Sequence, residues 1–544
     1  MPKKDDCTNK IVMLYLLRRI LPKPHDGKDV IVLRKFARII FSRLGLVGLL
    51  LALQVCILVF GVWKLSQYFF YFYVGFWALS IIVVLWLINT RDNPSYKLAW
   101  AIPILLFPVF GGLFYVLLGG KRMTKRMRKK VREVYETTIP LLKQESQTLE
   151  ELQFENKDAI NQVKYIASAS LFPVYKDTYT EYFPSGEAKF ERLKEELEKA
   201  ERFIFLEYFI IQEGVMWNTI LEILARKVKQ GVEVRVMYDD MGCLMTLPYK
   251  YANKLRAMGI KCEVFNPFRP ELTALLNNRD HRKIVVIDGS VGFTGGINLA
   301  DEYINVYEKH GHWKDAALML KGPAVWNLTM MFLQIWGYSS KCGDDFEKYR
   351  PEPQKMKAYR NCGGFVLPYG DSPLDDEDIG ETVYLNLINK AKNYIYINTP
   401  YLIIDNELTV ALCTAAKSGV DVRIVTPHIA DKWYVHMVTQ AYYPQLIEAG
   451  VKIFEYTPGF VHAKTFVVDD EYAAVGTINM DYRSLYLHFE CGVWLYRTDS
   501  IARIKEDYLK TLEVCQRITP ADYKHANRVK RLLQAILRVF APLM

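Results

Sequence analysis

The sequence lacks paired cysteines. Its nine cysteines include no Cys-x-x-Cys pair, and their number is odd. This pattern argues against a zinc site and against a disulfide framework, so we expect reduced thiols in a reducing compartment. The start of the chain also lacks the pattern of a cleavable signal peptide.

Charge is missing from three stretches near the start of the chain: Leu44 to Trp63, Tyr68 to Ile88 and Leu98 to Leu118. The first two match the roughly 20 residues that a helix needs to cross a bilayer. The third contains Pro103, Pro108, Gly111 and Gly112, which predict a kinked span or a re-entrant element. We therefore expect a basic segment over 1–43 and N-terminal transmembrane helices within 44–120.

The basic residues indicate an anionic partner. The net charge is +10, and eleven Lys and Arg precede the first uncharged stretch while eight lie between 121 and 132. With these apolar stretches, an anionic membrane surface is a better partner than nucleic acid. The positive-inside rule assigns both basic clusters to the cytoplasm, which predicts that the third stretch does not cross. We expect a multi-pass protein of the cell membrane with its catalytic part on the cytoplasmic face.

Helix and strand patterns alternate after a charged, helical connector over 121–163, which predicts an α/β fold. The first set comprises a helix over 187–202, a strand over 203–211, a helix over 220–230 and a strand over 232–238. The second has the same order over 382–393, 394–399, 408–418 and 420–426. We predict duplicated domains over 164–345 and 346–520, each a mixed sheet flanked by helices, related by a pseudo-twofold axis.

The last stretch, 521–544, is basic and amphipathic. Val529, Leu532, Leu533, Ile536, Leu537 and Phe540 fall on one helical face. This stripe predicts either an interfacial membrane helix or packing against the protein's own core, and the sequence leaves both open.

The strongest signal is a repeated motif. His281-Arg-Lys283 is followed by Asp288 and then Gly295-Gly296-Ile-Asn298, and His462-Ala-Lys464 is followed by Asp469 and then Gly476-Thr477-Ile-Asn479. The four shared residues are offset by 181 positions throughout. One such motif alone is a weak match, but two in a common register are not expected by chance.

The spacing suits a phosphodiester. Each motif is predicted on a strand, so His and Lys two residues apart share a face, while Arg282 or Ala463 points away. Two halves then make one pocket with two His, two Lys, Asn298 and Asn479. The Lys and Asn side chains would stabilise the phosphoryl oxygens, with one His attacking phosphorus and the other protonating the leaving oxygen. We assign His281 as nucleophile and His462 as acid, and expect no metal and no cofactor.

Carboxylates are needed to orient the histidines. Glu490 follows His462 by 28 residues and is its predicted partner. The matching position in the first half is Lys309, so we assign Asp315 to His281. Asp288 and Asp469 are expected at strand ends, as framework more than chemical residues. Arg279, Tyr303, Arg483 and Ser484 are predicted either to bind lipid head groups or to shape the pocket.

At these residues the chain resembles the phospholipase D superfamily, and more narrowly the bacterial cardiolipin synthases. The resemblance rests on both motifs, on Thr399-Pro400-Tyr401, and on the stretch from Ala99 to Gly120; Gly370-Asp-Ser-Pro373 and Leu402-Ile-Ile depart from it. It implies transfer of a phosphatidyl group from one phosphatidylglycerol to another through a phosphatidyl-histidine, giving cardiolipin and glycerol.

Two other enzymes remain open. The pocket motifs do not distinguish acceptors, so transfer to water or to serine on the same scaffold is the main alternative. A nuclease of the same superfamily is a more distant one, because the apolar stretches argue against it. A non-enzymatic scaffold would not need both motifs intact.

Overall fold

A computed structural model gives the structure of the protein. It describes 52–53, 55–56, 59–61, 63–64, 69–108, 110–119, 125–268, 277–340, 345–374, 377–524 and 527–543. The chain forms two compact units, one of 1–75 with 269–272 and one of 76–268 with 273–544. In the first unit the structure describes short helical stretches between 52 and 64 and the start of α4 (Phe69–Ile88). The predicted basic segment 1–43 lies outside the described residues.

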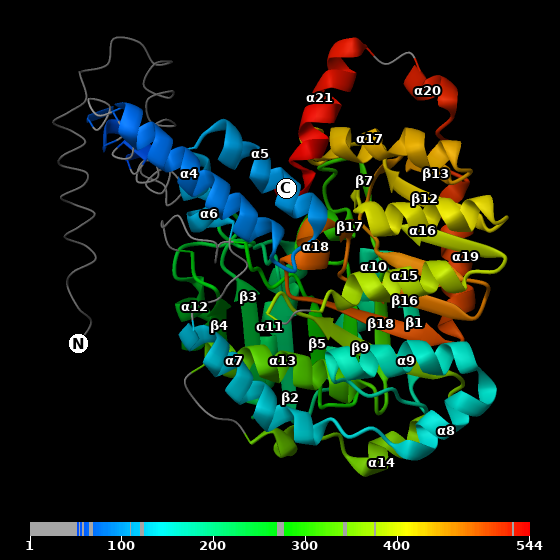
Figure 1. The fold of residues 1–544 in the computed structure, drawn as a ribbon. Coiled ribbons are helices and arrows are strands. Elements are labelled where there is room, and N and C mark those ends of the chain that lie inside the picture. Colours follow the sequence, from blue (N-terminus) through cyan, green and yellow to red (C-terminus); the bar gives the residue numbers. More distant parts are fainter. Residues whose placement is uncertain are drawn as a thin grey trace, which may run out of the picture. The chain divides into compact units, whose positions relative to one another are not determined.

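The second unit is built on two mixed sheets (Figure 1). The first has the strand order β1-β8-β6-β5-β2-β3-β4, in which β2, β3 and β4 are parallel and the other pairings are antiparallel. Its strands are β1 (Tyr179–Phe183), β2 (Phe203–Tyr208), β3 (Glu233–Asp239), β4 (Lys261–Phe265), β5 (Ile284–Ile287), β6 (Val291–Gly295) and β8 (Ala317–Lys321).

The second sheet repeats that arrangement. Its order is β9-β18-β16-β15-β10-β12-β13-β19, so each of its first seven strands has a counterpart in the first sheet, with β19 added at the end. The predicted internal duplication is thus confirmed. The strands are β9 (Phe365–Asp371), β10 (Tyr394–Asn398), β12 (Asp421–Pro427), β13 (Lys452–Tyr456), β15 (Thr465–Val468), β16 (Tyr472–Gly476), β18 (Glu490–Tyr496) and β19 (Cys515–Arg517).

Helices cover both faces of each sheet. On the first sheet, α10 (Gly186–Glu198) and α11 (Val215–Lys229) pack on the face of Ile204 and Leu206, whereas α13 (Val325–Ser339) packs on the face of Phe203 and Phe205. This alternation follows from the two-residue period of a strand. On the second sheet, α15 (Ile379–Lys390) and α19 (Ser500–Leu512) take opposite faces, because Tyr384 stacks on Phe466 and Tyr508 stacks on Tyr396.

The predicted elements agree with α10, β2, α11 and β3 in the first half. In the second half they agree with α15, β10, α16 (Asn406–Lys417) and β12. Between the apolar region and the first sheet lie α7 (Lys125–Thr138), α8 (Ser146–Glu155) and α9 (Lys157–Ser170). The remaining helices are α12 (Tyr251–Ala257), α14 (Pro353–Met356), α17 (Trp433–Glu448), α18 (Tyr482–Tyr486), α20 (Pro520–Lys524) and α21 (Arg528–Val539). The sequence-based domain boundaries stay predictions.

The third uncharged stretch folds back on itself. Helices α5 (Pro94–Leu106) and α6 (Phe110–Leu118) form a hairpin, and the Tyr96 hydroxyl donates to the Gly119 carbonyl at 2.6 Å. A Cβ at Gly111 would lie 2.2 Å from the Pro103 carbonyl oxygen, so the close approach of the two helices requires glycine. A single kinked helix is therefore the wrong interpretation of this stretch.

The transmembrane helices expected from the sequence are not found in the described part of the chain. The first predicted span, 44–63, lies mostly outside the described residues, and the second corresponds to α4. Across the residues that the structure describes, no helix has both the length and the apolarity required to cross a membrane.

Candidate active site

The two motifs occupy equivalent places in the two sheets. His281 and Lys283 lie in the extended segment that leads into β5, and His462 and Lys464 lie in the segment that leads into β15. All four side chains are buried, with residue exposures of 8% and 6% for the histidines. Arg282 points away from them, since its guanidinium pairs with Glu207 of β2 at 2.7 Å.

The carboxylates cross between the halves. His281 Nδ1 lies 2.9 Å from Glu490 Oε1, and His462 Nδ1 lies 2.7 Å from Asp315 Oδ2. The pairing predicted from the sequence, with each carboxylate beside the histidine of its own half, is therefore wrong. Each histidine is oriented by a carboxylate of the other half, so neither half holds a complete His–carboxylate pair.

Backbone pairing builds both crossings. The short strands β7 (His312–Lys314) and β14 (Gly459–Val461) pair in parallel, which places His462 beside Asp315. An isolated parallel bridge between Asp280 and Phe489 places His281 beside Glu490. In addition, His281 N donates to the Phe489 carbonyl at 2.9 Å and His462 N donates to the Lys314 carbonyl at 2.6 Å. These main-chain bonds hold each histidine beside its carboxylate, so the two side chains need little rearrangement to form the pair.

Asp315 and Glu490 occupy equivalent positions in the two sheets, but a longer loop in the first half obscures this in the sequence. Gly295 pairs with Ala317 and Gly476 pairs with Gly492, so Asp315 and Glu490 stand at the same place, two residues before each partner. Asp315 follows Gly295 by twenty residues, however, whereas Glu490 follows Gly476 by fourteen. A fixed 181-residue offset therefore pointed to Lys309, which pairs with Glu302 at 3.3 Å.

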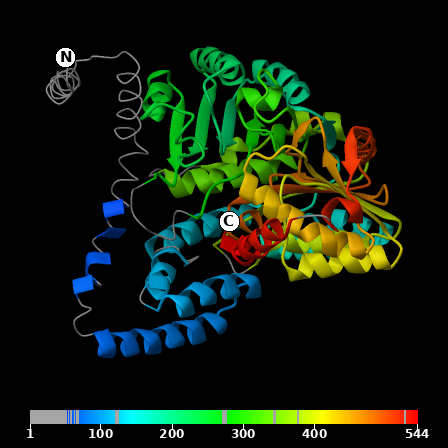
Figure 2. The same ribbon diagram turned by 90° about the horizontal axis from the view of Figure 1, so that it is seen from above.

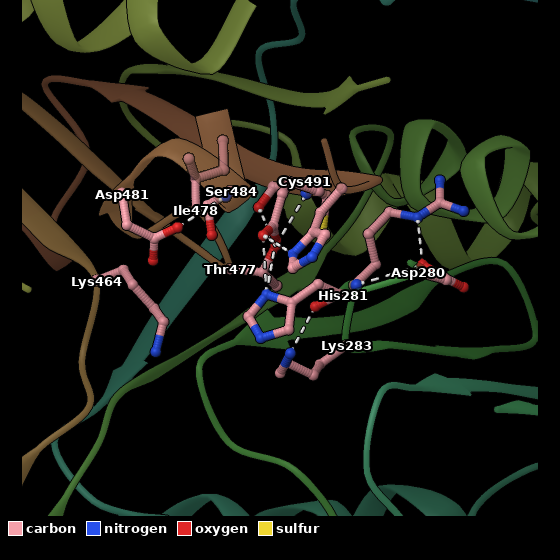
Figure 3. A network of polar contacts seen from close by, with 12 residues as sticks. Asp280, His281, Lys283, Lys464, Thr477, Ile478, Asp481, Ser484 and Cys491 are labelled. Atoms are coloured by element: carbon pink, nitrogen blue, oxygen red, sulfur yellow. Dashed lines mark hydrogen bonds and ion pairs between the residues drawn. The ribbon is translucent and has the colours of Figure 1, made fainter. Parts of the chain in front are cut away.

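The lysines bring positive charge to a buried pocket. Lys283 Nζ donates to the His281 carbonyl at 2.5 Å, and Lys464 Nζ donates to the His462 carbonyl. Burial lowers the pKa of Lys283 to about 8 and that of Lys464 to about 7. Because His281 bonds Glu490 and His462 bonds Asp315, each motif is completed by the other half, and the two motifs belong to one site. Figure 3 shows the side chains of Lys464 and Lys283 on the side of the His281 ring.

Both histidines are held in the neutral form. Burial lowers the pKa of His281 to about 3, against the opposing charge of Glu490. Burial and the charge of Lys464 lower the pKa of His462 to about 4. Despite its own burial, Glu490 has a pKa below its ordinary value because His281 and His488 both lie against its carboxylate and stabilise its charged form. A neutral imidazole that donates its Nδ1 proton to a carboxylate leaves the Nε2 lone pair ready for attack.

The two asparagines differ. Asn298 is satisfied by the protein, because its Oδ1 accepts from Ile210 N at 3.0 Å and its Nδ2 donates to the Tyr303 hydroxyl at 2.6 Å. Asn479 Oδ1 and Ser484 Oγ are buried without a hydrogen-bond partner among the described residues. Buried polar atoms normally have partners, so the second half presents two groups suited to the polar atoms of a ligand.

The motif aspartates anchor the sheets away from the histidines. The Asp288 carboxylate accepts from the backbone N–H groups of Glu201, Arg202 and Phe203 at 2.7 to 2.9 Å. The Asp469 carboxylate accepts from the N–H groups of Lys392, Asn393 and Tyr394 at 2.6 to 2.9 Å. Both residues have a positive φ, 53° and 51°. Each therefore ties the turn after one strand to the start of its neighbour, at the end opposite the histidine.

The other four candidates surround the pocket. The Tyr303 ring meets His462 edge-on, with centroids 5.6 Å apart. Arg279 lies 3.5 Å from Asp239 Oδ1 and donates to the Asn266 carbonyl. Burial lowers the pKa of Arg483, which lies with Ser484 on α18.

Sequence reasoning missed three residues of the site. His488 Nδ1 lies 3.8 Å from Glu490 Oε1, and its ring centroid is 5.7 Å from that of His281. Trp313 stands at the equivalent position beside His462, with centroids 5.4 Å apart. Thr477 donates its hydroxyl proton to Glu490. Trp313 and His488 each stand two residues before a carboxylate. This equivalence can be recognised in the sequence only when Asp315 is aligned with Glu490.

Two groups of residues have the ligand atoms for a cation. His281, His488 and Glu490 form one within the described chain, and Glu381, Asp405 and Glu407 form another. In the first, Glu490 is already bonded to His281 Nδ1. In the second, the Tyr486 hydroxyl oxygen lies 2.7 Å from a carboxylate oxygen of Glu381 and 2.7 Å from one of Asp405.

Comparison with known proteins agrees with this geometry. The sequence profile of the cardiolipin synthase PLD-like domain matches 193–332 and 384–512, one block in each half, and that of the phospholipase D-nuclease N-terminal region matches 78–120. An uncharacterized protein of Streptococcus mutans is 45% identical over 85% of this chain and 99% of its own length. A cardiolipin synthase of Alkalihalophilus pseudofirmus is 35% identical over 83% of this chain and 90% of its own.

Another cardiolipin synthase, from a Geobacillus species, is 35% identical over 86% of this chain and 93% of its own. Among solved structures, phosphatidylserine synthase of Haemophilus influenzae has a TM-score of 0.49 at 15% identity, over 67% of this chain and 93% of that one. The identity to full-length relatives, the two profile blocks and the duplicated sheets agree: the chain belongs to the cardiolipin synthase family of phospholipase D-type phosphatidyltransferases.

Proposed function

We propose that the protein transfers a phosphatidyl group from one phosphatidylglycerol to another, releasing glycerol and forming cardiolipin. The observation that carries the proposal is the crossed pair of buried His–carboxylate dyads, each with a buried lysine bonded to the carbonyl of its histidine. This arrangement offers two imidazoles to one phosphodiester, one for attack and one for proton transfer. The names of the full-length relatives support phospholipid substrates.

His281 would be the nucleophile. Its Nε2 attacks phosphorus while its Nδ1–H donates to Glu490. An N–P bond forms, and the P–O bond to glycerol breaks. His462 gives its Nε2 proton to the departing glycerol oxygen. Because the pKa of His462 is about 4 without substrate, the ring must take this proton from solvent as the anionic phosphodiester binds. The negative phosphodiester opposes the charge of Lys464 and thereby favours the imidazolium.

The second half-reaction reverses these roles. The hydroxyl of a second phosphatidylglycerol gives its proton to His462, and its oxygen displaces His281 from phosphorus. Lys283 and Lys464 stabilise the phosphoryl oxygens in both steps. The Ser484 hydroxyl would donate to the same oxygens, and Asn479 Oδ1 would accept from a glycerol hydroxyl. One phosphodiester is exchanged for another, so no activated donor is consumed.

We further propose that the apolar segment before Lys121 attaches the protein to the cell membrane, with the catalytic unit on the cytoplasmic face. Support comes from the exposed apolar side chains of α4, among them Val74, Ile82 and Leu85, with 52%, 61% and 57% exposed. Washing membranes with alkaline carbonate should leave the full-length protein in the pellet. Release into the supernatant would contradict attachment.

Lipid products from purified protein test the reaction. With phosphatidylglycerol alone, mass spectrometry should find cardiolipin and glycerol in equal amounts. Phosphatidic acid as the main product would instead indicate transfer to water, the alternative on this scaffold. A product that forms only when a nucleotide-activated lipid is added would contradict the proposed reaction.

A further inference from the structure

The C-terminal helix α21 packs through its polar side. Lys530 Nζ donates to Gln440 Oε1 at 3.1 Å, and Gln534 Nε2 donates to the Met437 carbonyl at 3.3 Å. Arg538 continues this row, with its guanidinium carbon 4.4 Å from the centroid of the Tyr442 ring. The spacing of four residues makes these side chains one face of the helix, and α17 lies against that face.

The apolar stripe of α21 points the other way. Val529 is 70% exposed, Leu532 64% and Ile536 48%, and no residue of the helix is fully buried. A helix that merely covers a soluble core places such a stripe inward. Of the two readings that the sequence left open, packing of the stripe against the protein's own core is therefore wrong for these residues. Within the helix, only Leu537 packs against the core, and it is partly buried.

The charge of α21 suits an anionic surface. The helix has no acidic residue, and besides Lys530 and Arg538 on the α17 side it contains Arg528 and Arg531, which are exposed. An exposed apolar stripe flanked by basic side chains is the pattern of a helix that lies in the head-group region of a membrane. Basic residues near such a surface gain attraction from anionic lipids.

The turn that follows α21 contacts both the apolar helices and a helix of the candidate site. Beyond the helix, Ala541 and Pro542 are buried, and Leu543 packs against the cluster that α4, α5 and α6 form. The same turn contacts α18, the helix of Arg483 and Ser484. Figures 1 and 2 both show α21 close to α5. On α5 itself, Leu98 and Leu106 are 58% and 67% exposed, which extends the apolar surface.

We propose that α21, with the exposed side chains of α5, is a docking surface for an anionic lipid bilayer. The stripe enters the head-group region while the polar side stays on α17. Through the turn after α21 and through α18, this contact holds the catalytic pocket at the lipid surface. The inference deepens the proposed function, because it names the surface from which lipid substrates reach the pocket.

Hydrogen exchange of the full-length protein tests the docking. The protein is placed in lipid nanodiscs that each hold one chain, made either of phosphatidylcholine alone or with phosphatidylglycerol. The amides of 528–540 should exchange more slowly in the anionic discs, by about fivefold for each basic residue held at the surface. High salt should reduce the difference, because salt screens surface charge.

Substitutions on the stripe give the matched comparison. The double variant L532S/I536S should lose the protection, whereas A535S, which places a serine on the exposed surface outside the stripe, should keep it. Equal exchange in both kinds of disc would overturn the proposal. Protection that appears only in discs with two chains would also overturn it, because a second copy of the chain would then cover the stripe. The measurement needs no turnover, so a chain without transferase activity could still show docking, and the proposed function would fail separately.

Discussion

The two catalytic histidines have different neighbours at one equivalent position. The ring beside His281 is His488, and the ring beside His462 is Trp313, each two residues before a carboxylate. Burial lowers the pKa of His488 as it lowers that of His281, so both rings stay neutral, as a nucleophile requires. Trp313 is an indole without a titratable group, so a proton that His462 takes up when substrate binds meets no second titratable ring there.

An activated substrate should separate the two roles. Nitrophenol leaves phosphatidyl nitrophenol without a proton, so the first step needs the nucleophile and not the acid. We expect H281A to release no nitrophenol. H462A should release a burst of about one nitrophenol per chain and then stall, because the phosphatidyl-histidine needs His462 as base for the second step. Stopped-flow absorbance measures the burst.

The crossed carboxylates extend this test. E490Q should slow the burst, because Glu490 orients His281. D315N should leave the burst and slow turnover of phosphatidylglycerol by about 10²- to 10⁴-fold, the usual contribution of a general acid–base group. The opposite pattern, with D315N slowing the burst, would mean that His462 is the nucleophile.

The lysines set the alkaline limit of activity. The pKa of Lys464 is about 7 and that of Lys283 about 8, both lowered by burial. Each lysine attracts a phosphodiester only while protonated, so kcat/KM should fall as the pH rises through 7 to 8. Arginine keeps its proton in this range, so K464R should move the alkaline limb to higher pH whatever its maximal rate. An unchanged limb in both K464R and K283R would assign it to another group.

At the scale of elements, the aspartate anchors carry stability more than chemistry. Asp288 and Asp469 each accept three backbone N–H groups at the start of a neighbouring strand. D288A and D469A should each lower the free energy of unfolding by about 3 kcal/mol, the scale of hydrogen bonds to a charged group.

Both variants should keep most of the kcat of the wild type, measured per folded molecule. Thermal unfolding followed by circular dichroism, with activity below the transition, makes the comparison. A large loss of kcat at an unchanged unfolding temperature would make the aspartates chemical residues instead.

Several elements could be predicted from the sequence because local pattern decides them. The strands at 203–208 and 394–398 are apolar runs between amphipathic helices, and both motifs share one spacing. The matched anchors Asp288 and Asp469 were expected at strand ends for the same reason.

The crossing of Glu490 and Asp315 could not be predicted, since it depends on how two halves of the chain pack. The longer loop after Gly295 shifted the register that the motifs suggested. For the third uncharged stretch the sequence left a kinked span and a re-entrant element open, because the choice depends on the approach of Gly111 to Pro103 in the folded hairpin. The outward stripe of α21 depends on its polar contacts with α17, which hydrophobic periodicity alone cannot show.

At the scale of the whole molecule, one chain supplies both halves of its site. The strands β7 and β14 join the halves beside His462, and the bridge from Asp280 to Phe489 joins them beside His281. A mixture of H281A and H462A chains should therefore stay inactive, as each chain lacks one histidine of its own site. Activity in the mixture, measured as cardiolipin formed from phosphatidylglycerol, would show that sites form between chains.

The central claim is a single two-histidine site that exchanges phosphodiesters through a covalent intermediate. Its most direct test is exchange of labelled glycerol by the purified protein. The substrate and product sides differ little in free energy, so excess labelled glycerol should enter phosphatidylglycerol and should also convert cardiolipin back to it. H281A should show neither reaction. Absence of exchange by wild-type protein that still forms cardiolipin would contradict the account.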